Sequence, residues 1–150
     1  MLDTPPHLKT AFATDSLAWV DADFAWARHL VVYDLMPGKA DLLDASAFRR
    51  PGETARQPAA GCPGDPGAIG MADQWAARMK GLDGAGVLFT TGLSDRAAMA
   101  LAAAGTFPVV IEHRRPIHDV ITRLQQLMRR DPPLWMCRVL RYGAPDHDRL

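Results

Sequence analysis

Short oxygen-bearing side chains gather in one stretch of the chain and are the first candidates for chemistry. They are Asp15, Ser16, Asp21 and Asp23. They follow Leu8–Thr14, an apolar run with the composition of a buried strand, and we call residues 15–28 the elbow. Because α/β proteins commonly bind ligands or metals at the carboxyl ends of such strands, the elbow is a candidate site. The alternative is structural: Asp15 and Ser16 make a turn, and Asp21 caps a helical turn over Ala22–Arg28.

A second candidate is the turn after Val87–Thr91, an uninterrupted apolar run that predicts a strand buried on both faces. Gly92 and Ser94 lie in this turn, and a helix is predicted over Asp95–Ala104 with Ser94 as its N-cap. Free backbone N–H groups at the start of such a helix point toward a bound anion.

A third candidate follows Phe107–Glu112, which predicts another short buried strand. The next three side chains are basic: His113, Arg114 and Arg115. Pro116 then opens a helix that is predicted to run through Arg130. Basic side chains at this position would neutralise an anionic ligand.

The alternation of strands and helices with short connections predicts parallel strands and right-handed crossovers. The strand ends at Asp15, Gly92 and His113 should then open on one edge of the sheet, as a crevice with an acidic and a basic wall. The predicted fold is α/β, a single domain over residues 8–130 with a mixed sheet of about five strands in βββαβαβα order, flanked by helices. Residues 131–150 are expected to be a tail with a short helix over Leu134–Tyr142 and a frayed end.

The middle of the chain predicts a hairpin, a long loop and a helix. Leu30–Leu35 and Lys39–Phe48 are expected to be paired strands, although the second is also compatible with a helical turn. Arg49–Gly70 has few apolar anchors and is either a lid or partner-docking loop over the elbow, or a tolerated insertion. Met71–Lys80 returns to helical spacing.

Composition excludes little beyond disorder and fibres, since 48% of residues are hydrophobic and 23% are charged. No apolar run approaches the roughly 20 residues that span a bilayer, and the N-terminus lacks the features of a secretion signal, so a cytoplasmic location is expected. Cys62 and Cys137 lack CxxC spacing, which argues against a thiolate metal site or a disulfide framework. Few aromatic residues lie among the arginines near the C-terminus, so nucleic acid is not the expected partner.

Four segments in this order resemble the dinitrogenase iron–molybdenum cofactor-binding family, the NifX and NafY type of carrier proteins. They are LKTAFATD, VDADFAWARHLVVYDL, GAGVLFTTGLSDRAAMALAAAGTFPVVI and PIHDVITRLQQLMRRDPPLW. The tail with its Pro pair and Trp135 resembles the NifX branch. The resemblance implies a ribonuclease H-like architecture. It also implies a protein that is not an enzyme and carries the iron–molybdenum cofactor, or its iron–sulfur precursor, as cargo in nitrogen fixation. Its partners would be the assembly scaffold, the precursor-synthesising protein and apo-dinitrogenase, without a nucleic acid or membrane.

The elbow departs from the family pattern at one residue. Family members typically read Asp-Gln-His-Phe-Gly, where the His is thought to hold the cluster, whereas Asp23 takes that position here. A carboxylate is a harder and more anionic ligand than imidazole, so His29 and His113 are the substitute ligands to consider. The alternatives are a strand-edge His29 with satisfied hydrogen bonds and an exposed loop His113. Together, the strand ends and the resemblance predict a cargo site made of Asp15, Asp21, Asp23, Phe24, His29, Gly92, Ser94, His113, Arg114 and Arg115.

Two other functions remain open. One is an interaction module of the nitrogenase assembly machinery that does not bind metal, which fits the altered elbow. The other is a divalent-metal hydrolase of ribonuclease H-like fold that uses Asp15, Asp21, Asp23 and Asp34. The absence of an evident nucleophile with its base favours the carrier over catalysis.

Overall fold

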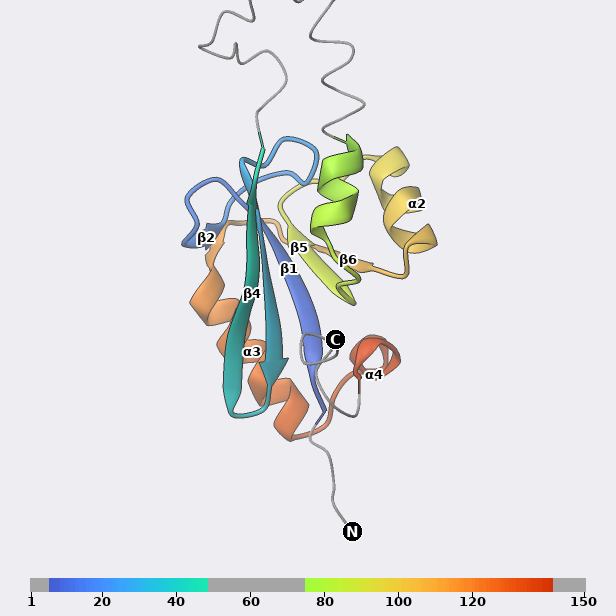
Figure 1. Ribbon diagram of the computed structural model, residues 1–150. Coiled ribbons are helices and arrows are strands. Elements are labelled where there is room, and N and C mark those ends of the chain that lie inside the picture. Colours follow the sequence, from blue (N-terminus) through green and yellow to red (C-terminus); the bar gives the residue numbers. More distant parts are fainter. Residues whose placement is uncertain (1–5, 49–74, 142–150) are drawn as a thin grey trace, which may run out of the picture.

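The computed structural model describes residues 6–48 and 75–141, and Figure 1 shows their arrangement. The strands are β1 Leu8–Thr14, β2 Trp19–Val20, β3 His29–Met36, β4 Lys39–Ala47, β5 Val87–Thr90, β6 Phe107–Val110 and β7 Arg115–Pro116. The helices are α2 Asp95–Ala103, α3 Ile117–Arg129 and α4 Leu134–Val139, and residues 75–81 form a further helix ahead of β5. The predicted loop Arg49–Gly70 and the start of the helix predicted over Met71–Lys80 lie outside the described residues.

A mixed five-stranded sheet in the order β4-β3-β1-β5-β6 organises the fold. β3 pairs antiparallel with both β1 and β4, which confirms the hairpin and excludes the helical alternative for Lys39–Phe48. β5 pairs parallel with both β1 and β6. Because parallel strands end at the same edge, the prediction that Asp15, Gly92 and His113 follow strand ends on one edge is confirmed.

Alternation along β1 separates two apolar layers, one on each face of the sheet. Leu8 and Phe12 belong to the cluster that includes α3, where Phe12 stacks on Phe89 with ring centroids 5.6 Å apart. Ala11 and Ala13 face the opposite layer, which includes residues of α2 and of the helix over 75–81. The sheet therefore has helices on both faces, and its ends remain open for loops (Figure 1).

The strand β6 differs from its prediction as a buried strand. It is an edge strand, four residues long, and Phe107 and Val110 at its ends are exposed. β6 pairs with β5 on one side. The Trp135 ring of α4 stacks on Phe107, the first residue of β6, with ring centroids 5.2 Å apart. An apolar run of this length predicts a buried strand, but the strand order places β6 at the edge of the sheet.

A two-stranded sheet between β2 and β7 was not predicted. Trp19 pairs with Pro116 and Val20 with Arg115, and the Ile117 N–H donates to the Ala18 carbonyl at 2.9 Å. This pairing ties the elbow to the start of α3. Two-residue strands carry no hydrophobic period, so only the tertiary structure reveals them.

Candidate functional site

The carboxylates at the start of the elbow bind the elbow's own backbone. Asp21 accepts hydrogen bonds from the Asp15 N–H at 2.7 Å and the Thr14 hydroxyl at 3.4 Å. Asp15 accepts the N–H of Arg28 at 2.9 Å, across the base of the elbow. The turn-making role of Asp15 is thus supported. The predicted helical turn over Ala22–Arg28, capped by Asp21, is wrong, because these residues form turns and bends.

Asp23, at the position of the family's His, lies against the end of β5. One carboxylate oxygen accepts the Ala25 N–H at 2.8 Å. The other lies 2.7 Å from where a Cβ on Gly92 would stand, so only a glycine fits at that position without displacing the carboxylate. The structure therefore brings the predicted site residues Asp23 and Gly92 into contact.

Thr90 joins the elbow to this strand end. Its hydroxyl oxygen accepts the Phe24 N–H at 2.9 Å and lies 3.1 Å from the Ala22 carbonyl and 2.8 Å from the Gly92 carbonyl. The Phe24 side chain is fully buried and packs edge-on against Trp75. Phe24 therefore anchors the elbow in the core.

Arg78, on the helix over 75–81, is the residue of this region that the sequence analysis missed. Only 1% of it is exposed, and one guanidinium nitrogen donates to the carbonyls of Phe24 at 3.0 Å and Ala27 at 2.6 Å. The guanidinium also lies over the Phe48 ring, 4.6 Å from its centroid. Arg78 thus binds backbone carbonyl groups of the elbow, and no sequence pattern predicts such contacts.

Burial lowers the pKa of Arg78, while the negative charges of Asp23 and Asp15 oppose that shift. The elbow carboxylates therefore have a buried counter-charge. An acidic residue at position 23 is consistent with this positive charge next to the loop.

Ser94 is the N-cap of α2, as predicted, because its hydroxyl accepts a hydrogen bond from the Ala97 N–H at 3.1 Å.

The basic triplet lies beside the other half of the elbow. The Arg114 guanidinium lies over the exposed Trp19 ring, 5.3 Å from its centroid, and Arg115 belongs to β7. His113 and Arg115 line a cavity of about 370 Å³ between β5, α3 and α4. Its other lining residues are Phe89, Ile111, Glu112, Asp119, Val120, Arg123, Leu124, Leu127 and Trp135. The cavity thus has an apolar floor and a charged rim.

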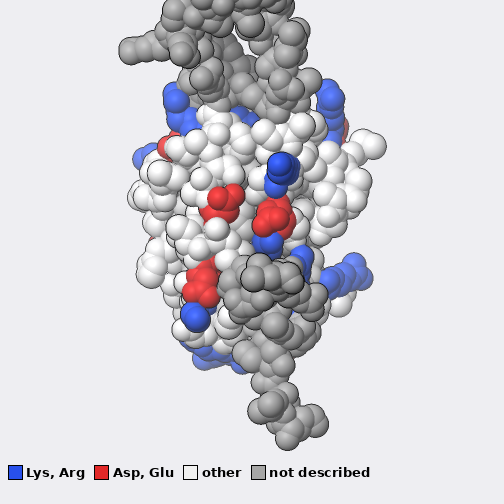
Figure 2. All heavy atoms as spheres, in the orientation of Figure 1, with Lys and Arg blue, Asp and Glu red and all other residues white. Residues whose placement is uncertain are grey.

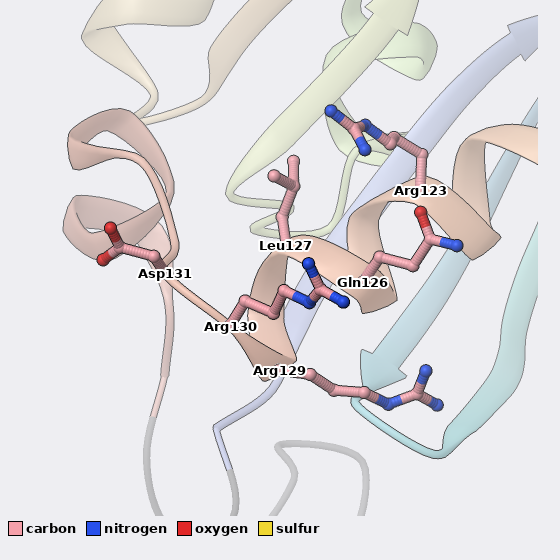
Figure 3. Close-up of a pocket in the computed structure, with 6 residues that line it drawn as sticks. All are labelled: Arg123, Gln126, Leu127, Arg129, Arg130 and Asp131. Atoms are coloured by element: carbon pink, nitrogen blue, oxygen red, sulfur yellow. The ribbon is translucent and has the colours of Figure 1, made fainter.

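A second hollow, of about 650 Å³, adjoins this cavity along α3 and shares Arg123 and Leu127 with it. Figure 3 shows Arg123 and Leu127 on α3 and Arg130 where the helix ends, with Arg129 and Asp131 on opposite sides of the view. On the face drawn in Figure 2, by contrast, acidic and basic side chains are interspersed. Of these two hollows, the one of about 370 Å³ is lined by the predicted site residues His113 and Arg115.

His29 and Asp34 lie on β3 and do not line the cavity of His113 and Arg115. His29 is half-buried opposite Thr14, at the elbow end of the sheet. Asp34 lies five positions after His29 on β3, where it pairs with Lys9 of β1. At the usual rise per residue, Asp34 is therefore about 17 Å from the elbow end of the sheet. It is buried and bonded to His7 at 2.8 Å, so it does not join the carboxylates proposed for a hydrolase.

Among residues 6–48 and 75–141, no group of three or more His, Cys, Asp or Glu side chains is arranged to hold a metal ion. In the same residues, no helix has the length and apolar character needed to cross a membrane.

Comparisons with known proteins place the chain in a family. The profile of the family described as "Dinitrogenase iron-molybdenum cofactor" matches residues 7–127. The chain is 25% identical over 136 residues to Protein NifX of Herbaspirillum seropedicae, covering 91% of this chain and 84% of that protein. It is 27% identical over 144 residues to Protein NifX of Azotobacter vinelandii, covering 95% and 82% of the two chains. For Protein NifY of Azotobacter vinelandii, the identity is 25% over 143 residues, covering 95% of this chain and 51% of that protein. Because the profile covers most of the chain, from before β1 into the last turn of α3, this protein belongs to the dinitrogenase iron–molybdenum cofactor family.

Proposed function

We propose that this protein is a nitrogen-fixation accessory protein that binds and carries the nitrogenase iron–molybdenum cofactor, or its iron–sulfur precursor, during cofactor assembly. The family match over residues 7–127 and the relatives named NifX and NifY support this role. The protein is then a cytoplasmic carrier and not an enzyme, and its partners are the assembly scaffold, the precursor-synthesising protein and apo-dinitrogenase. The strand order β4-β3-β1-β5-β6, with β3 antiparallel to its neighbours, supports the ribonuclease H-like architecture.

The single observation that carries the cargo site is the cavity lined by His113 and Arg115. His113 is exposed and supplies an imidazole, which suits iron better than a carboxylate does. Arg115 and Arg123 supply positive charge at the rim, and Phe89 and Trp135 line the apolar part. An anionic cluster with an organic acid would gain charge neutralisation there and partial exclusion of water.

The elbow supports this placement by what its carboxylates already do. Asp23 is bonded to the Ala25 N–H and packed against Gly92, so a cluster ligand role would require it to leave both. Asp15 and Asp21 close the elbow in the same way. In our proposal these residues shape the loop beside the cargo, and His113 takes over the ligand role.

The test is anaerobic titration of the purified protein with the cofactor and with its iron–sulfur precursor, followed by visible absorption and electron paramagnetic resonance. We expect stoichiometric binding that weakens at least tenfold in His113→Ala and in Arg115→Ala, and less in Arg114→Ala. His118→Ala is the matched control, because His118 is exposed on α3 and outside the cavity lining. Equal binding by wild type, His113→Ala and Arg115→Ala would remove the cavity as the site.

Asp23→His provides the opposite test, since it restores the residue that family members typically have in the elbow. If the cargo lies in the cavity lined by His113 and Arg115, this substitution leaves the affinity for the cargo and its paramagnetic signal unchanged. A tighter complex with an altered signal would instead place the site at the elbow.

The second candidate function is an interaction module of the assembly machinery that binds no metal. The observation that favours it is the exposed apolar tip of the elbow, where Leu17 is 52% and Trp19 39% exposed. Leu17 adopts a positive φ of 68°, held by the Thr14 hydroxyl that accepts its N–H at 2.9 Å. Backbone strain of this kind is common at functional sites. Scaffold binding that is lost in Trp19→Ser but kept in His113→Ala, in a protein that takes up no cluster, would favour this function.

A further inference from the structure

Arginines gather around the hollow at the end of α3. Arg123, Arg129 and Arg130 line it together with Gln126, Leu127 and Asp131 (Figure 3). The three arginines are exposed, and within the described residues none of them forms an ion pair with a carboxylate. The described residues of the hollow thus supply three positive charges against the one negative charge of Asp131.

Helix stability explains only part of this arrangement. Basic side chains in the last turn of a helix interact favourably with its dipole, which accounts for Arg129 and Arg130. Arg123 lies nearly two turns earlier, beyond the range of that effect. Like charges around one concave surface repel one another and raise the local concentration of anions. A ligand that supplies negative charge would therefore relieve a repulsion that the described residues do not neutralise.

The spacing of these groups defines the ligand more closely. Arg123 lies on α3 and Arg130 directly follows its last residue, so the two arginines are separated by about 10 Å along the helix axis. Leu127 lies between them in Figure 3 and offers an apolar contact. The pattern along the helix is therefore positive, apolar and positive.

We propose that this hollow is a docking site for an acidic helical segment of a protein partner. Carboxylates seven residues apart on such a helix match Arg123 and Arg130, and an apolar side chain between them packs on Leu127. Arginine pairs well with carboxylates because its planar guanidinium donates two parallel hydrogen bonds. No aromatic side chain is among the described residues that line the hollow, so these residues offer no stacking platform of the kind that a single-stranded nucleic acid uses.

The hollow shares Arg123 and Leu127 with the proposed cargo cavity. A partner segment docked there would lie directly beside the cargo, which suits a protein that receives or delivers it. This part of the inference rests on the proposed function. The docking site itself does not, and its test contains no cargo, so the two proposals can fail separately.

The probe is a capped, alanine-based, 14-residue helical peptide with two glutamates seven positions apart and a leucine midway on the same face. A peptide with glutamine in place of both glutamates is its control. Fluorescence anisotropy of the labelled peptides is measured with the full chain at low and at physiological salt. We expect the glutamate peptide to bind at least tenfold more tightly than the glutamine peptide, with an affinity that falls as salt rises.

We expect Arg123→Gln and Arg130→Gln each to lower the affinity for the glutamate peptide by about tenfold, which is the effect of losing one charge-assisted hydrogen-bonded pair. Arg138→Gln is the matched control, because Arg138 is an exposed arginine on α4 that does not line this hollow. Circular dichroism checks that every variant is folded. Equal affinity for the two peptides, or equal binding by the two variants and wild type, would overturn the proposal. So would tighter binding, through the same arginines, of a single-stranded RNA oligonucleotide or of phosphatidylglycerol vesicles.

Discussion

Replacing Arg78 by Met tests whether one buried guanidinium holds the elbow in place. Methionine keeps much of the apolar stem but loses the hydrogen bonds to the carbonyls of Phe24 and Ala27 and the contact over the Phe48 ring. Because Arg78 is 1% exposed, water does not replace those bonds without local opening. The two carbonyls then remain buried and unsatisfied.

The size of the effect follows from two opposing terms. Each orphaned carbonyl costs about 1–3 kcal/mol, so the loss of both costs about 2–6 kcal/mol. Removing the guanidinium also removes its desolvation penalty, the same burial effect that lowers the pKa of Arg78, and this returns a part of the loss. We expect the free energy of unfolding to fall by about 3 kcal/mol. For a chain of 150 residues, this lowers Tm by about 6–12 °C.

Two assays separate a general loss of stability from a loss of the elbow. Urea unfolding measures the free energy, and hydrogen exchange by mass spectrometry measures protection of the Phe24, Ala25, Trp26 and Arg28 amides, which are bonded within or beneath the elbow. We expect these amides to exchange faster in Arg78→Met than the amides of α3 do. Arg129→Met is the control, since Arg129 is exposed. Stability within about 0.5 kcal/mol of wild type, with unchanged elbow exchange, would refute the role of Arg78.

Three further substitutions test the contacts around the elbow and the core. We expect Gly92→Ala to lower the free energy of unfolding by about 1 kcal/mol, because the new Cβ displaces the Asp23 carboxylate from the Ala25 N–H. In an Asp23→Ala background, the same substitution should change the free energy of unfolding very little. Thr90→Val keeps the shape of the side chain but leaves the Phe24 N–H without its acceptor, so we expect a loss of about 2 kcal/mol. Phe12→Ala removes a fully buried ring that stacks on its neighbour, with an expected loss of about 3–5 kcal/mol.

Urea unfolding measures all three effects, and each has its own contradicting result. An equal loss from Gly92→Ala with and without the Asp23 side chain would mean that the clash lies elsewhere. Thr122→Val is the control for Thr90→Val, since Thr122 is exposed on α3, and equal effects of the two would deny the anchoring role of Thr90. A loss below about 1 kcal/mol for Phe12→Ala would contradict its central place in the core.

The sequence alone determined the elements whose signals are local. Strand β1 has the predicted bounds Leu8–Thr14, and α2 begins after its predicted N-cap Ser94. The helical period in Ile117–Arg129 and the short connections also predicted α3 and the shared edge of the parallel strands. Caps, turns and hydrophobic periods act over a few residues, which is why the sequence of a single chain sufficed to predict them.

The tertiary structure alone decided which of the candidate residues meet. Asp23 contacts Gly92, 69 positions along the chain, and Arg78 reaches the elbow carbonyls from a separate helix. β6 is an edge strand because of its place in the sheet order, although its composition resembles that of a buried strand. The cavity of His113 and Arg115 likewise needs α3 and α4 to enclose it. Contacts between distant segments depend on how layers pack and on which backbone groups they leave to be satisfied, and neither leaves a period or a motif in the sequence.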